Sequence, residues 1–355
     1  MIGVVLKGHD FKYEVSELIK LFTSEFRMID TRDCMMVVEN SLFFYNDKVF
    51  SKTVYCENYN EINEHVEYRS LEGLCERERK KVIKETIKRS MFKILEKKFR
   101  ITPPWGILTG IRPVKIVHSL LDDNFSDEQI REKLTNDYLI SDEKIDLALD
   151  IARRERQFIY PIDENKVSLY VSIPFCPTRC YYCSFPANSL KQFGRLKPTY
   201  VAKLLEEVDG VAKLLEEQNK SIETLYIGGG TPTTLSPEEM DTLIKGLFER
   251  FDLSNIKEFT VEAGRPDTIN REMLEVLKKN NVDRISINPQ SMNDETLQKI
   301  GRNHNVQDII DTFHLAREVG FDNINMDIIL GLVDENLDMV RNTLDKIKEL
   351  SPESL

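Results

Sequence analysis

The stretch SLYVSIPFCPTRCYYCSFP, residues 168–186, decides how the chain folds and what it can bind. It opens with SLYVSI, a β-rich run, and continues into three cysteines, Cys176, Cys180 and Cys183, with the spacing Cys-x3-Cys-x2-Cys. A strand followed directly by this loop places three thiols at the carboxyl end of the strand. The other three cysteines are scattered, and we interpret them as ordinary, partly buried thiols.

Regular alternation of β-rich runs and helical patterns follows this stretch. The runs are SLYVSI (168–173), TLYIGGG (224–230), EFTVEA (258–263), RISINP (284–289) and INMDIIL (324–330), and the helical patterns cover 196–218, 236–250, 268–279, 293–318 and 336–349. Such alternation predicts parallel βα units. The near-continuously apolar runs predict strands covered on both faces. Five units predict an α/β fold, a partial parallel (β/α) barrel with its chemistry at the carboxyl ends of the strands.

The N-terminal part has a different pattern. Residues 1–100 mix short β-rich runs with a helical stretch near 11–26 and a long charged helix near 75–98, which predicts a small α+β domain. The segment PPWGILTGIRPVK, residues 103–115, breaks the periodicity with three prolines and two glycines. We therefore expect a domain at 1–100, a helical linker region at 101–165 and the barrel at 166–355.

The final residues, SPESL, resemble the lead-in to a sixth strand. We therefore expect the barrel to be truncated before that strand. A barrel with an unpaired edge exposes free backbone groups and apolar surface, so the chain expressed alone is expected to aggregate readily.

Composition limits the class of partner. The 355 residues carry a formal net charge of −11, which argues against non-specific binding to nucleic acid or to anionic membranes. No run of about 18 apolar residues is present. The N-terminus MIGVVLKGHDFKYE also lacks the features of a secretory leader, so a cytoplasmic location is expected.

Three thiols on one short loop suit a metal centre better than a disulfide in such a compartment. Zinc in a structural site takes four protein ligands, and none of the five histidines lies near the loop in the sequence. An iron–sulfur cube on three thiolates leaves one iron open to an outside ligand. The residues thus favour a 4Fe–4S cluster on Cys176, Cys180 and Cys183, with zinc or unreactive thiols as the alternatives.

Polar residues mark the predicted strand ends. GGGTPT, residues 228–233, allows close backbone approach and positive φ. Further along, polar side chains interrupt the ends of the next strands or follow them: Glu262, Gln290, Arg302 and Asp327. Such groups are costly inside a barrel unless they are paired, which makes them binding candidates. The alternative is a buried structural pair, for instance Arg302 with Asp327.

The segments LYVSIPFC, CYYCSFP, GGGTPT, VEAGRPD, INPQSMNDETLQKIGRNHN and MDIILGL, within residues 168–332, resemble the radical S-adenosylmethionine superfamily. Among its members they are similar to the oxygen-independent coproporphyrinogen III oxidases, the coproporphyrinogen dehydrogenases. PPWGILTGIRPVK resembles the HemZ-type branch of that family. The resemblance implies two cofactors, a 4Fe–4S cluster and S-adenosyl-L-methionine, whose amino and carboxylate groups chelate the open iron. One electron from the cluster then yields a 5′-deoxyadenosyl radical.

The resemblance also implies a set of S-adenosylmethionine-binding residues: Tyr170, Tyr182, Gly229, Gly230, Thr231, Glu262, Gln290, Arg302 and Asp327. Tyr182 is implied at the adenine and Tyr170 near the sulfonium. The glycine segment is implied at the methionine amino group. Plain core or turn roles for the two tyrosines and the glycines remain alternatives.

The implied reaction is the oxidative decarboxylation of two propionates of coproporphyrinogen III to vinyl groups, which gives protoporphyrinogen IX in haem biosynthesis. The implied partners are an anionic tetrapyrrole substrate, for which Arg179 is a candidate cation, and an unidentified electron donor and acceptor. Well-studied members carry Cys-Gly-Cys where this chain has Cys183-Ser184-Phe185. Related haem chaperones also lack that extra cysteine, so a haem-binding chaperone is the main alternative. Another tetrapyrrole-acting radical enzyme is the third.

Overall fold

The computed structural model describes residues 1–31 and 34–355 and divides the chain into two compact units, 1–162 and 163–355. The helices that follow the proline-rich segment fall within the first of these units. The division into three parts expected from the sequence stays a prediction. Among the described residues, none of the helices combines the length and the apolar character that crossing a bilayer requires.

The first unit contains a mixed five-stranded sheet with the strand order β2-β1-β3-β4-β5. Its strands are β1 (Ile2–Lys7), β2 (Phe26–Met28), β3 (Met36–Tyr45), β4 (Lys48–Glu57) and β5 (Asn60–Ser70). Strands β3, β4 and β5 form an antiparallel meander, whereas β1 runs parallel to both of its neighbours. The α+β character expected for this part of the chain is therefore observed.

Helix α2 (Glu76–Phe99) packs on this sheet and is the long charged helix expected near residues 75–98. The other helices of the unit are α1 (Lys12–Ile19), α3 (Pro113–Asp122), α4 (Asp127–Tyr138) and α5 (Asp142–Ile159). Apolar side chains from α1 to α5 join those of the sheet in one buried cluster. Asn40 of β3 lies within this packing and donates to Ser51, Thr53 and Ser90, so a buried amide links sheet and helix without an unpaired donor.

The second unit is built on a parallel sheet with the order β12-β11-β10-β9-β6. Its strands are β6 (Lys166–Ile173), β9 (Ser221–Gly229), β10 (Glu258–Glu262), β11 (Arg284–Ser286) and β12 (Ile324–Asn325). The helices between and after them are α6 (Leu190–Phe193), α7 (Lys197–Glu217), α8 (Pro237–Arg250), α9 (Arg271–Lys279), α10 (Asp294–Lys299), α11 (Val306–Val319) and α12 (Leu337–Leu350). The alternating βα order predicted from the sequence is confirmed.

Four helices of this unit begin at a polar residue whose side chain accepts a hydrogen bond from the first helical turn: Ser236 before α8, Asn270 before α9, Asn305 before α11 and Asn336 before α12. At α8 the cap is reciprocal, because Glu239 accepts from the Ser236 N–H in return. Helix α11 ends at Gly320, whose φ of +103° suits the left-handed position after a helix. Local sequence therefore sets where the helices begin and end.

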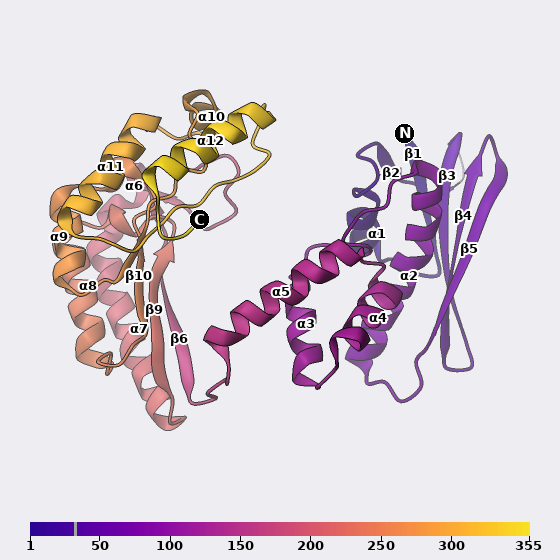
Figure 1. The fold of residues 1–355 in the computed structure, drawn as a ribbon, viewed down its shortest axis with the longest axis horizontal. Helices are drawn as coiled ribbons and strands as arrows, with labels where there is room; N and C mark the ends of the chain where they lie inside the picture. The colour runs from indigo at the N-terminus through magenta and orange to yellow at the C-terminus, as the bar shows by residue number, and fades with distance from the viewer. Residues whose placement is uncertain (32–33) are drawn as a thin grey trace. The chain divides into compact units, whose positions relative to one another are not determined.

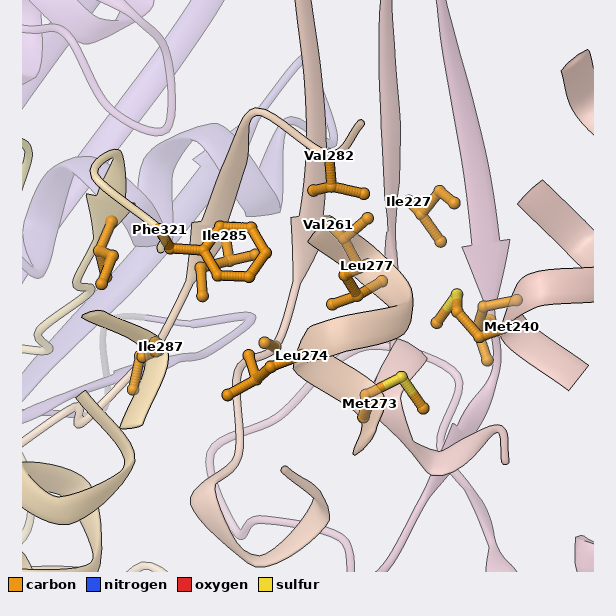
Figure 2. Packing of buried hydrophobic residues seen from close by; sticks show 14 of the residues in the cluster. Ile227, Met240, Val261, Met273, Leu274, Leu277, Val282, Ile285, Ile287 and Phe321 are labelled. Atoms are coloured by element: carbon orange, nitrogen blue, oxygen red, sulfur yellow. The ribbon is translucent and has the colours of Figure 1, made fainter. Parts of the chain in front are cut away.

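Helices α7, α8, α9 and α11 lie on one side of the sheet (Figure 1), and apolar side chains from both layers interdigitate there (Figure 2). In β6, Val171 and Ile173 are buried on this side, while Tyr170 and Ser172, which point to the opposite face, are exposed, Tyr170 by 52%. The expectation that both faces of the strands are covered is therefore wrong for β6. Its other face is polar because the unit supplies no second layer of helices there.

The last residues of the chain pair beside β12. Ser354 forms a parallel bridge with Asn325, and the Met326 N–H donates to the Ser354 carbonyl over 3.0 Å. The resemblance of SPESL to the beginning of a sixth strand thus has a structural counterpart on the outer side of β12.

The hydrophobic core of this unit lies between the helices and one face of the sheet, which leads to a prediction about stability. Leu274 of α9 is fully buried in the layer between helices and sheet (Figure 2), so Leu274→Ala should lower the free energy of unfolding by about 2–5 kcal/mol. Leu214 of α7 is 49% exposed, and Leu214→Ala should change it by less than about 0.5 kcal/mol. Urea denaturation of both variants tests this. Equal effects would show that the packing of Figure 2 does not carry the stability of this unit.

Candidate active site at the strand ends

The three clustered cysteines lie on the loop that follows β6. Cys176 ends the short strand β7 (Phe175–Cys176), which pairs in parallel with β8 (Asn188–Ser189). Cys176 and Cys180 are buried, and Cys183 is half-buried. Within the described residues, no group of three His, Cys, Asp or Glu side chains is arranged to hold a single metal ion.

Cys176 has the most enclosed environment of the three. Burial raises the pKa of its thiol, and the nearby Cys183 and Cys180 act in the same direction. The Thr231 hydroxyl, which donates to Cys176 Sγ over 3.5 Å, and the charge of Arg265 oppose this. The expected site residues Thr231 and Cys176 are therefore in direct contact.

Two glycines at the end of β9 approach the cysteine loop closely. A Cβ on Gly229 would lie 2.7 Å from Ser172 Oγ, and the φ of Gly229 is +110°. A Cβ on Gly230 would lie 2.7 Å from the Phe175 carbonyl and 2.9 Å from Cys176 Sγ. The glycine segment predicted from the sequence thus has a packing role, because it lets β9 meet the strand that presents Cys176.

A buried arginine holds the middle of the cysteine loop. Arg265, which follows β10, is 4% exposed and donates to the Thr178 carbonyl over 3.0 Å and to its hydroxyl over 3.1 Å. The same guanidinium donates to both carboxylate oxygens of Asp267, each over 3.0 Å. His304 Nδ1 lies 3.6 Å from Asp267, and neither ring nitrogen of His304 has a hydrogen-bond partner among the described residues.

Arg302 reaches the loop from a second direction. It is 8% exposed, and it donates to the Asn288 carbonyl over 2.7 Å and to the Tyr182 hydroxyl over 3.1 Å. In the described part of the chain it forms no ion pair, so the structural pair with Asp327 considered from the sequence is not observed. Tyr182 and Arg302, both expected at the site, are brought into contact.

Gln290 is expected at the site and adopts a backbone conformation that is rare for residues other than glycine. Its φ is +65°, and it is buried. Its N–H donates to the Asp327 carbonyl over 2.9 Å, and its carbonyl accepts from the Ile329 N–H over 3.0 Å. Such conformations cost free energy and concentrate at functional sites. Gln290 and Asp327 are thus joined through the backbone.

The face of β6, β9 and β10 that points away from the helix layer carries a tyrosine pair and a carboxylate. The rings of Tyr170 and Tyr226 stack with centroids 5.5 Å apart, and the Tyr226 hydroxyl donates to Glu262 over 2.7 Å. Burial raises the pKa of Glu262; the Tyr226 hydrogen bond lowers it, and the charge of Asp327 raises it further. Burial also raises the pKa of Tyr226, with Glu262 adding to the effect. Tyr170 and Glu262 belong to the site residues named from the sequence, and Tyr226 joins them.

Sequence reasoning missed Tyr226, Arg265, Asp267 and His304. Tyr226 carries a detectable signal, because it lies two residues before the glycine segment and therefore on the same face of the strand as Gly228. Arg265 and Asp267 lie within VEAGRPD, the segment that supplied Glu262. For His304 the sequence offers only its position two residues after Arg302. Arg179, by contrast, donates to the Cys183 carbonyl over 3.3 Å and so contributes to holding the loop.

Comparison with known proteins decides the family. The model of the radical SAM superfamily matches residues 170–347, half of the chain and nearly all of the second unit. The chain belongs to the radical SAM superfamily. This confirms the resemblance stated from the sequence, and it confirms the α/β fold with a parallel sheet.

Individual radical SAM relatives are similar to this chain over different shares of its length. The oxygen-independent coproporphyrinogen-III oxidase-like protein HemZ of Bacillus subtilis is 45% identical over 287 residues, 79% of this chain and 57% of that protein. The heme chaperone HemW of Lactococcus lactis is 36% identical, over 52% of this chain and 46% of that protein. The solved coproporphyrinogen III oxidase HemN of Escherichia coli is 30% identical, with a TM-score of 0.49, over 57% of this chain and 45% of that one. The chain spans about half the length of the curated relatives it matches.

Membership of the radical SAM superfamily implies a 4Fe–4S cluster and S-adenosylmethionine, and the residues present fit both. Three soft thiol ligands lie on one loop, as a cube with one open iron requires. Gly230 has no side chain, so the space beside Cys176 Sγ stays free; a Cβ at Gly230 would lie 2.9 Å from this sulfur. The carboxylate of Glu262 and the tyrosine pair provide polar and aromatic contacts at the ends of neighbouring strands.

The glycine contact yields a test. Gly230→Ala should displace Cys176 or the Phe175 carbonyl, since the added methyl lies within 3.0 Å of both, and should cost about 1–3 kcal/mol of stability. Iron bound after anaerobic reconstitution should fall with it. Gly210→Ala in α7 is the control, because nothing lies within 4 Å of its added Cβ. Unchanged iron content in Gly230→Ala would contradict the contact with Cys176.

Asp267 yields a pH-dependent test. Burial raises the pKa of its carboxyl, but the pairing with His304 and Arg265 outweighs this and lowers the pKa to about 2, below the ordinary value of about 3.9. The stability it contributes is present above pH 4 and is lost as the pH falls from about 4 to about 2. The difference in the free energy of unfolding between wild type and Asp267→Asn should therefore shrink over that range. Urea denaturation at stepped pH measures it, and a constant difference would show that Asp267 is not held as a carboxylate.

Proposed function

We propose that the chain takes part in oxygen-independent oxidative decarboxylation of coproporphyrinogen III to protoporphyrinogen IX, in porphyrin and haem biosynthesis. One observation carries the proposal: the three-cysteine loop packs on the glycine end of β9 where the carboxyl ends of the parallel strands meet. Similarity to HemZ over 79% of the chain supports the tetrapyrrole assignment. Because the chain spans about half of such relatives, the complete reaction is proposed for the whole protein.

In this proposal Cys176, Cys180 and Cys183 bind the 4Fe–4S cluster. The S-adenosylmethionine shell is the set named from the sequence: Tyr170, Tyr182, Gly229, Gly230, Thr231, Glu262, Gln290, Arg302 and Asp327. When bound, the two cofactors supply a one-electron cleavage of a carbon–sulfur bond that yields the 5′-deoxyadenosyl radical. Removing a hydrogen atom from the β-carbon of a propionate, followed by loss of carbon dioxide and of one electron to an acceptor, leaves a vinyl group.

The chain's own groups have distinct tasks in this scheme. Glu262, held by the Tyr226 hydroxyl at 2.7 Å, is oriented to accept a hydrogen bond from an ammonium group. Arg302 fixes the Tyr182 ring at the cysteine loop through its hydroxyl. The glycine segment and Thr231 keep Cys176 buried, which limits the access of water and oxygen to its sulfur.

The substrate side of the proposal is an anionic tetrapyrrole, with an electron donor and an acceptor of unidentified nature and a cytoplasmic location. A haem chaperone of the same superfamily is the second candidate. It is favoured by Ser184-Phe185 after the last cysteine and by 36% identity to the heme chaperone HemW of Lactococcus lactis.

Anaerobic reconstitution tests the proposal. Wild type should bind iron and sulfide amounting to one 4Fe–4S cluster and, with a reductant, release 5′-deoxyadenosine from S-adenosylmethionine. Replacement of Cys176, Cys180 and Cys183 by Ala should abolish both while leaving the fold intact, since the loop lies outside the core. Cys75→Ala, at an exposed cysteine, is the control.

Product analysis separates the two candidate functions. Each conversion removes carbon dioxide and two hydrogen atoms from a propionate, and the vinyl product is identified by its absorption and retention after oxidation to the porphyrin. Protoporphyrin formed from coproporphyrinogen III supports the dehydrogenase. Stoichiometric haem binding without vinyl formation supports the chaperone instead. A cluster that survives in the triple alanine variant would overturn both.

A further inference from the structure

The first unit contains a cavity that the proposed reaction does not use. It has a volume of about 570 Å³, within the range of roughly 300–1,000 Å³ that small-molecule sites occupy. Its walls come from α1, α2, α3, α4 and the segment 107–111, which belongs to the proline-rich stretch PPWGILTGIRPVK. Segments distant in sequence thus converge on one concave surface within a single compact unit.

One wall of the cavity is cationic. It carries five basic side chains of α2 against two carboxylates, Glu14 and Glu85, and the basic residues are Arg77, Lys80, Lys81, Lys84 and Lys88. Their spacing of three or four residues puts them on one face of the helix. This concentration contrasts with the net charge of −11 of the whole chain. The helix therefore directs a local positive field into the cavity.

The two carboxylates do not neutralise this wall. Glu14 pairs with Lys84, and Glu85 lies 3.8 Å from Lys81. The remaining cations, Arg77, Lys80 and Lys88, have no carboxylate within ion-pair distance in the described part of the chain. Glu14, Glu85 and Glu17 act on Lys88 through their charges without forming an ion pair with it. An anion entering the cavity would therefore meet three cations that have no ion-pair partner among the described residues.

Lys88 differs from Arg77 and Lys80 because its side chain is half-buried. Its ammonium donates to Thr109 Oγ1 over 2.6 Å and to the Ile107 carbonyl over 3.3 Å, so it fixes the 107–111 segment on α2. Burial lowers the pKa of Lys88. The charges of Glu14, Glu85 and Glu17 oppose this, but none of these carboxylates forms an ion pair with Lys88 among the described residues. A bound anion would supply a partner in direct contact with the half-buried ammonium.

The rest of the cavity is apolar. Its remaining walls are formed mainly by Ile107, Leu108, Ile111, Ile116 and Tyr138. Ile111 is 52% exposed at the surface, whereas Ile107 in the same segment is buried. A purely inorganic anion would leave this surface in water, whereas a ligand with an apolar body would cover it.

We propose that this cavity binds a small amphipathic polyanion, with its acidic groups on Arg77, Lys80 and Lys88 and its apolar body on the surface around Ile107 and Ile111. Two sources share this chemistry, a porphyrin carboxylate and a nucleotide phosphate. The porphyrin source rests on the proposed function, whereas the nucleotide source is independent of it.

Two probes separate these sources on the full chain without a reconstituted cluster. Coproporphyrin III is titrated by fluorescence and ATP by calorimetry, each at low ionic strength because charge contacts of this kind are screened by salt. Saturable binding of either probe is expected. Because neither measurement requires the cluster or turnover, its failure is distinguishable from failure of the proposed reaction.

Three variants locate the binding. Lys80→Glu places an acid on the exposed cavity rim and should raise Kd by roughly tenfold or more. Lys97→Glu makes the same charge change on α2 outside the cavity and should leave Kd unchanged. Ile111→Ser should also weaken binding, because it removes apolar surface without a change of charge. Both Lys80 and Ile111 are exposed, so these variants are expected to fold.

The outcomes decide the proposal. A shift for coproporphyrin III alone assigns the carboxylate source, and a shift for ATP alone assigns the phosphate source. If neither probe binds saturably, or if Lys80→Glu and Lys97→Glu have equal effects, the cavity is not an anion site and the proposal is overturned. A Kd that responds to Lys80→Glu but not to Ile111→Ser overturns the amphipathic part of it.

Discussion

The close approach of the β9 glycines to the segment 173–176 is the constraint on which the rest of the site depends. The Gly230 N–H donates to the Ile173 carbonyl and the Thr231 N–H to the Phe175 carbonyl, each over 2.8 Å. These bonds carry the pairing of β9 with β6 past the end of the sheet and into the cysteine loop. Any side chain at Gly229 or Gly230 would enter this contact. The position of Cys176 is therefore set by backbone contacts of the neighbouring strand.

Covering one face of the sheet with helices has a chemical consequence. The apolar side chains of β9 and β10 point into the helix layer, which leaves the other face for polar groups such as Tyr226 and Glu262. A carboxylate in this half-buried position keeps a raised pKa, so it gains from any cation or donor that binds beside it. Along β9 and β10, the alternation of side chains thus separates an apolar face, which packs on the helices, from a more polar face that carries Tyr226 and Glu262.

Much of this arrangement was predictable from the sequence. The βα alternation, the cysteine spacing and the polar residues at strand ends follow from local patterns, and the roles of Glu262 and Tyr170 in binding S-adenosylmethionine stay predictions. What could not be predicted depends on which side chains meet across the fold. In the sequence, Tyr226 resembles any aromatic residue of a strand, and only the structure shows that its hydroxyl donates a hydrogen bond to Glu262. Likewise, Arg302 donates to the Asn288 carbonyl and does not pair with Asp327. The expectation that both faces of the strands are covered is wrong for β6, because a run of apolar residues does not reveal how many layers pack against a sheet.

The loop that carries the cysteines has little regular structure of its own, so its shape is imposed from outside. Arg265 binds the Thr178 carbonyl and Arg302 binds the Tyr182 hydroxyl, while the Tyr181 N–H donates to the Ile300 carbonyl over 3.1 Å. Both arginines are nearly buried, and a guanidinium can engage several acceptors at once through donors at fixed angles. A lysine offers a single charged nitrogen and could not span the same acceptors. The units of β10 and β11 therefore hold the loop together with the glycine end of β9, and the geometry of the thiols depends on the assembled sheet more than on the cysteine segment itself.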